Sequence, residues 1–99
     1  MAPFAYFQKN FVPLAEAKIG VMTHAFNYGT GAFEGIRGNW NEEENILYIF
    51  RTKEHFERLC RSCRILKIDL PYTVDELVKL TVNLLTMNSY QEDVYIRPL

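Results

Sequence analysis

Two amphipathic segments separated by a proline limit the folds that this chain can adopt. Between residues 52 and 68 the apolar side chains recur at helical spacing. Pro71 blocks a continuous helix, and Thr73 with Glu76 has the spacing of a capping box, which predicts the start of a second helix. Each helix has an apolar face that another layer must cover.

The two apolar stripes differ in composition. The first consists of Phe56, Leu59, Cys60, Cys63 and Leu66. The second consists of Val74, Leu77, Val78, Thr81, Leu84 and Leu85. We expect the second helix to fray near Asn88.

Strand patterns precede the helices. Residues 4–8 and 11–17 flank Lys9 and Asn10, which predicts a hairpin with a two-residue turn. Pro13 favours an edge position for its second strand. Residues 23–32 are expected to form a short helical turn that begins at Thr23.

A second hairpin is expected in residues 32–50. The alternating segments 32–40 and 46–50 flank an acidic turn, residues 41–45. Residues 93–99 also alternate, with Val94 and Ile96 on one face and Tyr95 and Arg97 on the other. The pattern predicts one two-layer α+β domain, with a largely antiparallel sheet and two helices packed on one face.

Composition excludes several classes of protein. The formal net charge is −1 and charged residues make up 23% of the chain, so we expect no nucleic-acid partner. No apolar run approaches a membrane span and the first residues lack a signal-peptide pattern, so we expect a cytoplasmic protein without a membrane partner. Because the chain ends at Leu99 in a strand-like run, it is expected to be part of a longer protein.

The candidate sites for thiol and metal chemistry favour structural roles. Cys60 and Cys63 have redox spacing but lie within a helical stripe, so both are expected to be reduced and in the core. A metal site is not indicated, because His24 and His55 do not share their spacing. His24 is expected to orient the turn beside Thr23.

Residues 23–38, THAFNYGTGAFEGIRG, combine glycine with aromatic residues. Their spacing fits neither a dinucleotide-binding loop nor a P-loop. A close-packed strand corner and a ligand contact are both compatible with the pattern.

Several cationic and phenolic side chains are candidates for ion pairs or for ligand binding. Glu54 and Arg58 form an i,i+4 pair, as do Glu57 and Arg61, which predicts solvated ion pairs on the first helix. Tyr95 and Arg97 lie two apart on a strand. They can bind a carboxylate together or form an exposed sheet face.

Three motifs together resemble a known family. THAFNYGTGAFEGIRG, FRTKEHFERL and YIRPL occur in the order and at the separations found in branched-chain amino acid aminotransferases of fold type IV, which use pyridoxal phosphate. The resemblance spans residues 1–99 and implies the N-terminal small domain. Related D-amino acid aminotransferases and aminodeoxychorismate lyases fit less well, and a non-catalytic assembly domain is a third alternative.

The resemblance also implies roles for individual residues. Arg58 matches the arginine that binds the cofactor phosphate in this family, which is an alternative to its ion pair. The residues that match the substrate pocket are Tyr28, Phe33, Gly35, Tyr95 and Arg97. Of these, Arg97 is implied to bind the side-chain carboxylate of glutamate, while aromatic walls receive a branched aliphatic side chain.

The catalytic group is implied to lie outside this sequence. No lysine here matches the Schiff-base lysine of the family, so that lysine is expected beyond Leu99, in a C-terminal domain that would be this chain's partner. The isolated chain is therefore expected to be inactive. Similar enzymes are homodimers or larger and act on leucine, isoleucine or valine with 2-oxoglutarate.

Overall fold

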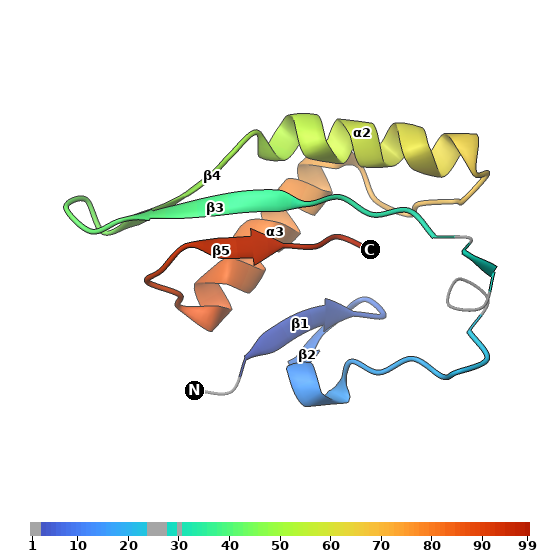
Figure 1. Ribbon diagram of the computed structural model, residues 1–99, viewed down its shortest axis with the longest axis horizontal. Coiled ribbons are helices and arrows are strands. Elements are labelled where there is room, and N and C mark those ends of the chain that lie inside the picture. Colours follow the sequence, from blue (N-terminus) through green and yellow to red (C-terminus); the bar gives the residue numbers. More distant parts are fainter. Residues whose placement is uncertain (1–2, 24–27, 30) are drawn as a thin grey trace.

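The computed structural model describes residues 3–23, 28–29 and 31–99 (Figure 1). The elements in chain order are β1 (Phe4–Phe7), β2 (Asn10–Pro13), the 3-10 helix η1 (Leu14–Glu16), β3 (Ile36–Asn41), β4 (Ile46–Ile49), α2 (Thr52–Ile65), α3 (Val74–Asn88) and β5 (Val94–Ile96). The predicted α+β class is confirmed, with both helices and every expected strand region present.

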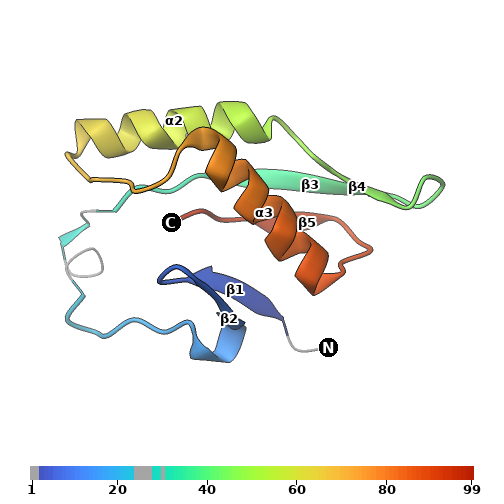
Figure 2. The ribbon, with the colours of Figure 1, turned by 180° about the vertical axis from the view of Figure 1, so that it is seen from behind.

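The strands form two separate antiparallel sheets, whereas the sequence predicts one largely antiparallel sheet. The strand order of the larger sheet is β4-β3-β5, and β1 pairs with β2 as a separate hairpin. Seen from behind, α3 crosses in front of the larger sheet and α2 runs alongside it (Figure 2). The hairpin lies beside the C-terminal end of α3, where the Asn88 side chain bonds to both backbone groups of Phe4, at 2.8 and 3.2 Å.

The core lies between the larger sheet and the two helices. Its most buried members are Ile36 of β3 and Phe56, Leu59 and Cys63 of α2, with exposed fractions of 0, 2, 5 and 5%. Val74, Leu77 and Val78 of α3 pack against this cluster, as do Ile49 and Ile96 of the neighbouring strands. The predicted stripes therefore face the sheet, except that Leu66 lies just beyond the end of α2 and is 50% exposed.

The cysteines are both free thiols. Cys63 is in the core, as expected, and burial raises the pKa of its thiol. Cys60 is only half-buried, so the expectation of a core position holds fully for Cys63 alone.

The first hairpin turns one residue earlier than predicted. Its turn residues are Gln8 and Lys9, with φ of 50 and 68°, and Phe7 pairs with Asn10. Two consecutive residues with positive φ match the right-handed twist of the strands that they join. The second strand ends at Pro13, after which η1 begins, so the predicted strand to residue 17 is too long.

The central strand β3 begins at Ile36 rather than at Ala32. The ladder with β5 stops at the pair Ile36 and Ile96. Beyond this pair the Glu34 N–H still donates to the Pro98 carbonyl, at 3.1 Å, but proline has no N–H to return a bond. Residues 32–35 therefore run beside the end of β5 without forming a regular ladder.

The predicted helical turn in residues 23–32 falls largely on residues 24–27 and 30, which lie outside the described part of the chain. Its first residue, Thr23, donates its backbone N–H to the Gly20 carbonyl at 3.1 Å. The predicted role of His24 also lies outside the described residues and stays a prediction.

The start of α3 has the capping box that the sequence predicts. The Thr73 side chain accepts a hydrogen bond from the Glu76 N–H at 3.2 Å, and the Glu76 carboxylate accepts one from the Thr73 N–H at 2.9 Å. The hydrogen bond from the Thr73 N–H is the largest of the effects that lower the pKa of the Glu76 carboxyl. At the other end the helix stops at Asn88, where the sequence predicts its end, and Asn88 is bonded to β1.

Replacing Thr73 with alanine is expected to destabilise the full-length protein by about 1 kcal/mol, because the Glu76 N–H loses its acceptor. Thr86→Ala is the matched control. Its hydroxyl donates to a helix carbonyl that already has a backbone partner in the ladder, so a change within about 0.5 kcal/mol is expected. Urea unfolding measures both variants, and equal effects would contradict a specific capping role.

Candidate functional site

Four of the predicted pocket residues are brought together at the end of β5. The guanidinium carbon of Arg97 lies 4.8 Å from the ring centre of Phe33 and 5.3 Å from that of Tyr95. Arg97 Nη2 also donates to the Tyr95 hydroxyl at 3.3 Å. These side chains are exposed, so they form an accessible surface with aromatic walls and a cation between them.

Gly35 completes this cluster by allowing a close approach. A Cβ atom at this position would lie 2.8 Å from Cζ of Tyr95 and would overlap its hydroxyl oxygen. Only glycine lets the Tyr95 ring lie this near the backbone. The explanation as a close-packed strand corner therefore applies at Gly35, whereas the ligand contact stays a prediction.

The pairing of β3 with β5 explains why these residues meet. Arg37 and Tyr95 are directly opposite, so both project from the face of the sheet that the helices do not cover. Val94 and Ile96 face the other way, as the alternation predicts, and Ile96 packs against the core. The predicted orientations of residues 94–97 are confirmed.

Tyr28, the fifth predicted pocket residue, lies on the surface with 71% of its area exposed. Most residues around it in the sequence lie outside the described part of the chain. Its place in the pocket therefore stays a prediction.

Arg58, the predicted phosphate ligand, lies on the exposed side of α2 and is paired with Glu34. Arg58 Nε donates to Oε2 at 2.8 Å, and Nη2 donates to Oε1 at 2.7 Å. His55 Nδ1 donates to the same Oε1 at 2.8 Å. Glu34 thus joins two side chains, one helical turn apart, to the segment that leads into β3.

The charge of Glu34 is favoured by these donors. The Arg58 guanidinium, followed by the His55 bond, lowers the pKa of the Glu34 carboxyl from its ordinary 4.5 to about 2, against the opposing effect of burial. The ion pair in turn raises the pKa of Arg58. Glu34 is therefore an anion throughout the physiological range.

The low pKa of Glu34 predicts acid sensitivity. A carboxyl that is more acidic when folded stabilises the protein above its unfolded pKa, and this contribution disappears as the pH falls from about 4.5 towards 2. One pKa unit is worth about 1.4 kcal/mol, and water screens part of the exposed Arg58, so we expect about 2 kcal/mol at pH 7.

The comparison of wild type with Glu34→Gln measures this contribution. The variant should unfold at a lower temperature at pH 7, and the difference should shrink steadily as the pH is lowered to 3. Thermal unfolding of the full-length protein across this range is the measurement. A difference that is independent of pH would contradict the role of ionised Glu34.

Neither predicted i,i+4 ion pair forms. Within the described residues the ion pairs are those of Glu34 with His55 and with Arg58. The prediction that Glu54 and Glu57 are the partners is therefore wrong. Glu34 competes successfully because it is buried and presents both oxygens to the guanidinium, whereas a pair on the helix surface gains little against water.

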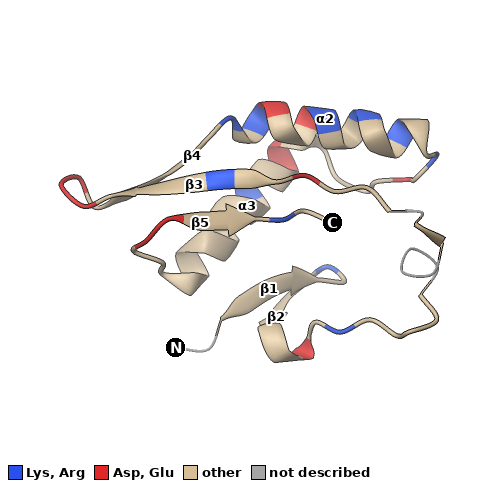
Figure 3. Cartoon of the chain, viewed as in Figure 1, with Lys and Arg blue, Asp and Glu red and all other residues tan. Residues whose placement is uncertain are grey.

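Glu34 and His55 are site residues that sequence reasoning missed. The sequence did contain a signal for Glu34. Ala32 and Ile36 pack on the core, and alternate residues of an extended chain face the same side, so residue 34 also points inward. A carboxylate at an inward position needs a cationic partner. Acidic and basic residues both occur along α2, and the extended segment that leads into β3 runs below this helix in Figure 3.

Arg58 has the chemical capacity to bind a further anion. Guanidinium carries five N–H donors, and two of them are used by Glu34. The remaining three include the edge formed by Nη1 and Nη2, and 60% of the side chain is exposed. A phosphate fits such an edge through two parallel hydrogen bonds.

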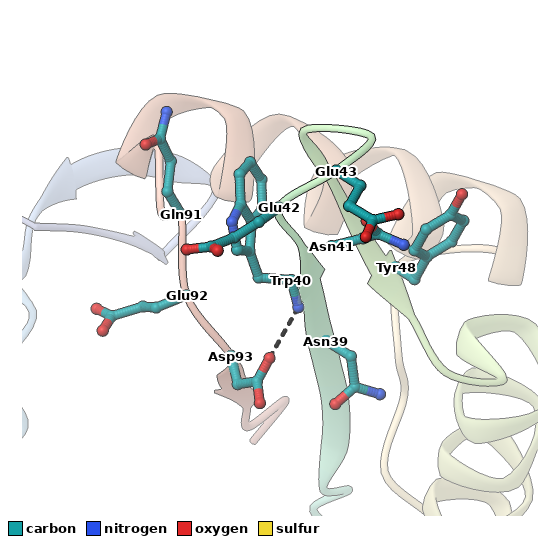
Figure 4. Close-up of a pocket in the computed structure, with 9 residues that line it drawn as sticks. All are labelled: Asn39, Trp40, Asn41, Glu42, Glu43, Tyr48, Gln91, Glu92 and Asp93. Atoms are coloured by element: carbon teal, nitrogen blue, oxygen red, sulfur yellow. Dashed lines mark hydrogen bonds between the residues drawn. The ribbon is translucent and has the colours of Figure 1, made fainter.

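Two surface hollows lie elsewhere. A groove of about 830 Å³ beside the β3–β4 turn is lined mainly by polar and acidic residues, including Trp40, Tyr48 and Asp93 (Figure 4). The Trp40 backbone N–H donates to the Asp93 carboxylate at 2.8 Å, which ties β3 to the residue that precedes β5. Neither this groove nor a second one, of about 460 Å³, is lined by the residues around Arg58 or Arg97.

Metal and membrane sites receive no support from the described residues. Among residues 3–23, 28–29 and 31–99, no three acidic, histidine or cysteine side chains are grouped as metal ligands. The helices in this part of the chain are also too short or too polar to span a bilayer.

The sequence of this chain matches one protein family and several known enzymes. The model of the class IV aminotransferase family matches residues 31–99. A probable branched-chain-amino-acid aminotransferase of Aquifex aeolicus is 52% identical over 96 residues, which are 97% of this chain and 31% of that protein. The chain thus spans about a third of the length of the relatives that it matches.

Solved structures of branched-chain aminotransferases also match this chain. The branched-chain aminotransferase of Thermoproteus uzoniensis, crystallised with norvaline, superimposes with a TM-score of 0.91 and 43% identity over 98% of this chain and 32% of that one. The branched-chain amino acid aminotransferase of Thermobaculum terrenum in its pyridoxal phosphate form superimposes with a TM-score of 0.87 and 34% identity. The match covers 97% of this chain and 31% of that one.

Proposed function

This chain belongs to the class IV aminotransferases, which use pyridoxal phosphate, and we propose that the full-length protein transfers amino groups between branched-chain amino acids and 2-oxoglutarate. The observation that carries the proposal is the cluster of Phe33, Tyr95 and Arg97, which combines aromatic surface with one cation. The relatives of this chain are named as branched-chain aminotransferases, in agreement with that chemistry.

Residues 1–99 form, in this proposal, the N-terminal small domain of the enzyme. The remainder of the protein supplies the lysine that reacts with the cofactor, and the isolated chain is inactive. Binding partners of the domain are the C-terminal domain of the same chain and a second subunit of a homodimer or larger oligomer. The enzyme works in the cytoplasm, in the biosynthesis of branched-chain amino acids.

Arg58 binds the cofactor phosphate. Its Nη1–Nη2 edge carries N–H donors that Glu34 does not use, and the side chain is open to solvent, so the residues present fit this group. Bound pyridoxal phosphate supplies the electron sink for the carbanion at the substrate α-carbon and carries the amino group between the half-reactions. This domain contributes binding and orientation to that chemistry.

The cluster around Arg97 receives the substrate. Phe33, together with Tyr28 from the preceding loop, offers apolar surface to a branched aliphatic side chain. Arg97 donates to the side-chain carboxylate of glutamate, while Tyr95 holds the guanidinium through its hydroxyl. One surface can thus accept an apolar substrate in one half-reaction and an acidic one in the other.

Turnover by the full-length protein tests the function. With pyridoxal phosphate present, L-leucine and 2-oxoglutarate should give glutamate and the branched-chain 2-oxo acid, whereas D-alanine should not react. Preference for D-alanine would move the protein to a different branch of the family. Absence of turnover with any amino acid, in a protein shown to be folded, would favour the alternative of a non-catalytic assembly domain.

The isolated chain provides a second test. We expect no turnover and no stoichiometric covalent labelling when it is mixed with pyridoxal phosphate and reduced with borohydride. Labelling accompanied by turnover of leucine would show that the reactive lysine lies within residues 1–99.

Replacing Gly35 with alanine is expected to raise the KM of the full-length enzyme for 2-oxoglutarate about tenfold, because the new methyl group displaces Tyr95 and frees Arg97. Tyr95 lies on the surface and can swing aside, so the fold should survive. Gly20→Ala is the control, since nothing lies within 4 Å of a Cβ there. An unchanged KM in the Gly35 variant would contradict the assignment of Tyr95 and Arg97.

A further inference from the structure

Glu34 is a buried anion in a position that the proposed function does not yet use. Only 5% of its surface is exposed, and it is the only buried side chain with a charge in the described part of the chain. Burying a carboxylate is costly unless its charge is paired and its oxygens accept hydrogen bonds. Three donated bonds meet this requirement, and two of them come from Arg58.

The geometry of these bonds restricts the guanidinium. Nε and Nη2 each reach a different oxygen of Glu34, so the plane of the group is fixed by two bonds of 2.8 and 2.7 Å. His55 holds Oε1 from another side at 2.8 Å, which limits rotation of the carboxylate. A long arginine side chain that is largely exposed loses considerable conformational entropy when it binds a ligand. The bonds to Glu34 already order this side chain, so less entropy remains to be lost on binding.

The segment around Glu34 faces two ways. Phe33 and Gly35 contact the pair Arg97 and Tyr95 on one side, while Glu34 reaches α2 on the other. The proposed substrate surface and the proposed phosphate ligand are therefore attached to three consecutive residues.

We propose that Glu34 is a positioning residue that presents the Nη1–Nη2 edge of Arg58 to the phosphate of the cofactor. The inference rests on the proposed function and deepens it, because it assigns a role to a residue that does not touch the cofactor. His55 acts with Glu34 by fixing the carboxylate. Through residues 33–35 the same contact also sets the distance between the phosphate ligand and the substrate surface.

Electrostatics and positioning predict opposite results for the removal of this carboxylate. A negative charge beside Arg58 repels the phosphate, so loss of the charge alone would strengthen binding of the cofactor. Loss of positioning would weaken it, because the guanidinium regains its freedom. Glu34→Gln keeps the length of the side chain and removes the charge, which makes the sign of the change decisive.

The experiment uses apoenzyme of the full-length protein, well below its unfolding temperature, and compares two probes. Glu34→Gln should raise the dissociation constant for pyridoxal 5'-phosphate about tenfold and change that for pyridoxal, which lacks the phosphate, by less than about twofold. Unchanged or tighter binding of pyridoxal 5'-phosphate would overturn the inference. Equal weakening of both probes would also overturn it, because that is the result of general damage to the fold.

A second variant separates position from charge. Glu34→Asp keeps the charge but is one methylene too short to reach both nitrogens of Arg58, so it should also weaken the binding of pyridoxal 5'-phosphate selectively. Wild-type binding in this variant would show that charge alone suffices and would reject positioning. This variant also provides a test if the glutamine variant does not fold.

The Arg58→Ala background distinguishes the inference from the proposed function. If Glu34 acts through Arg58, Glu34→Gln should have no further effect in that background. Should Arg58→Ala itself leave the affinity for pyridoxal 5'-phosphate unchanged, the assignment of the phosphate ligand fails. If Arg58→Ala weakens binding and the Glu34 variants do not, the proposed function stands and only the positioning role is rejected.

Discussion

Replacing Arg58 with alanine in the full-length enzyme is expected to weaken the binding of pyridoxal phosphate about 100-fold, or by about 2.7 kcal/mol. Two charge-assisted hydrogen bonds from the open edge of the guanidinium account for a loss of this size. Fluorescence or absorbance titration of the apoenzyme measures it. Pyridoxal without phosphate should bind almost equally to wild type and variant.

Two other variants on α2 refine this result. Arg58→Lys should fall between wild type and alanine, because an ammonium group retains the charge but cannot offer parallel donors. Arg61→Ala removes an exposed arginine from the same helix, outside the contacts of Glu34, and should bind the cofactor as wild type does. Equal losses in the Arg58 and Arg61 variants would attribute the effect to net charge and contradict a specific phosphate ligand.

Replacing Phe56 with alanine is expected to destabilise the domain by about 3 to 5 kcal/mol, since a large side chain that is 2% exposed leaves a cavity at the centre of the core. The loss affects α2 directly and so affects both His55 and Arg58. Hydrogen exchange of the peptide 52–65 in the full-length enzyme localises the change. Faster exchange of that peptide is the expected result.

Phe56→Leu is the matched control for this change. Leucine retains most of the apolar volume, so the loss should stay below about 1.5 kcal/mol. Similar exchange in the alanine and leucine variants would contradict the view that packing at residue 56 holds α2 on the sheet.

Local signals in the sequence located both helices, although α2 ends at Ile65, three residues before its predicted end at Ile68. Pro71 and the pair of Thr73 with Glu76 act over a few residues, and the structure has α3 begin where they predict. The hairpins were also found, but the first turn was placed one residue late. Gln8 and Lys9 adopt positive φ because strand twist demands it, and this tertiary requirement overrides the preferences of the individual residues.

The pairing of Arg58 was not accessible to the same reasoning. Glu54 is near in sequence and correctly spaced, whereas Glu34 becomes a neighbour only when α2 packs on the segment before β3. The contact between Phe33 and Arg97 likewise depends on the pairing of β3 with β5. Resemblance to a family pointed to Phe33, Arg58 and Arg97, but only the folded chain shows which side chains they meet.

The place of β5 in the larger sheet has a consequence for the folding pathway. Ile36 pairs with Ile96, although both helices lie between them in the chain. Closing so long a segment requires conformational entropy to be lost before the strand pair stabilises it, whereas the adjacent β3–β4 hairpin and the helices form through local contacts. We therefore expect the surface formed by Phe33, Tyr95 and Arg97 to be assembled late, after the β3–β4 hairpin and the helices.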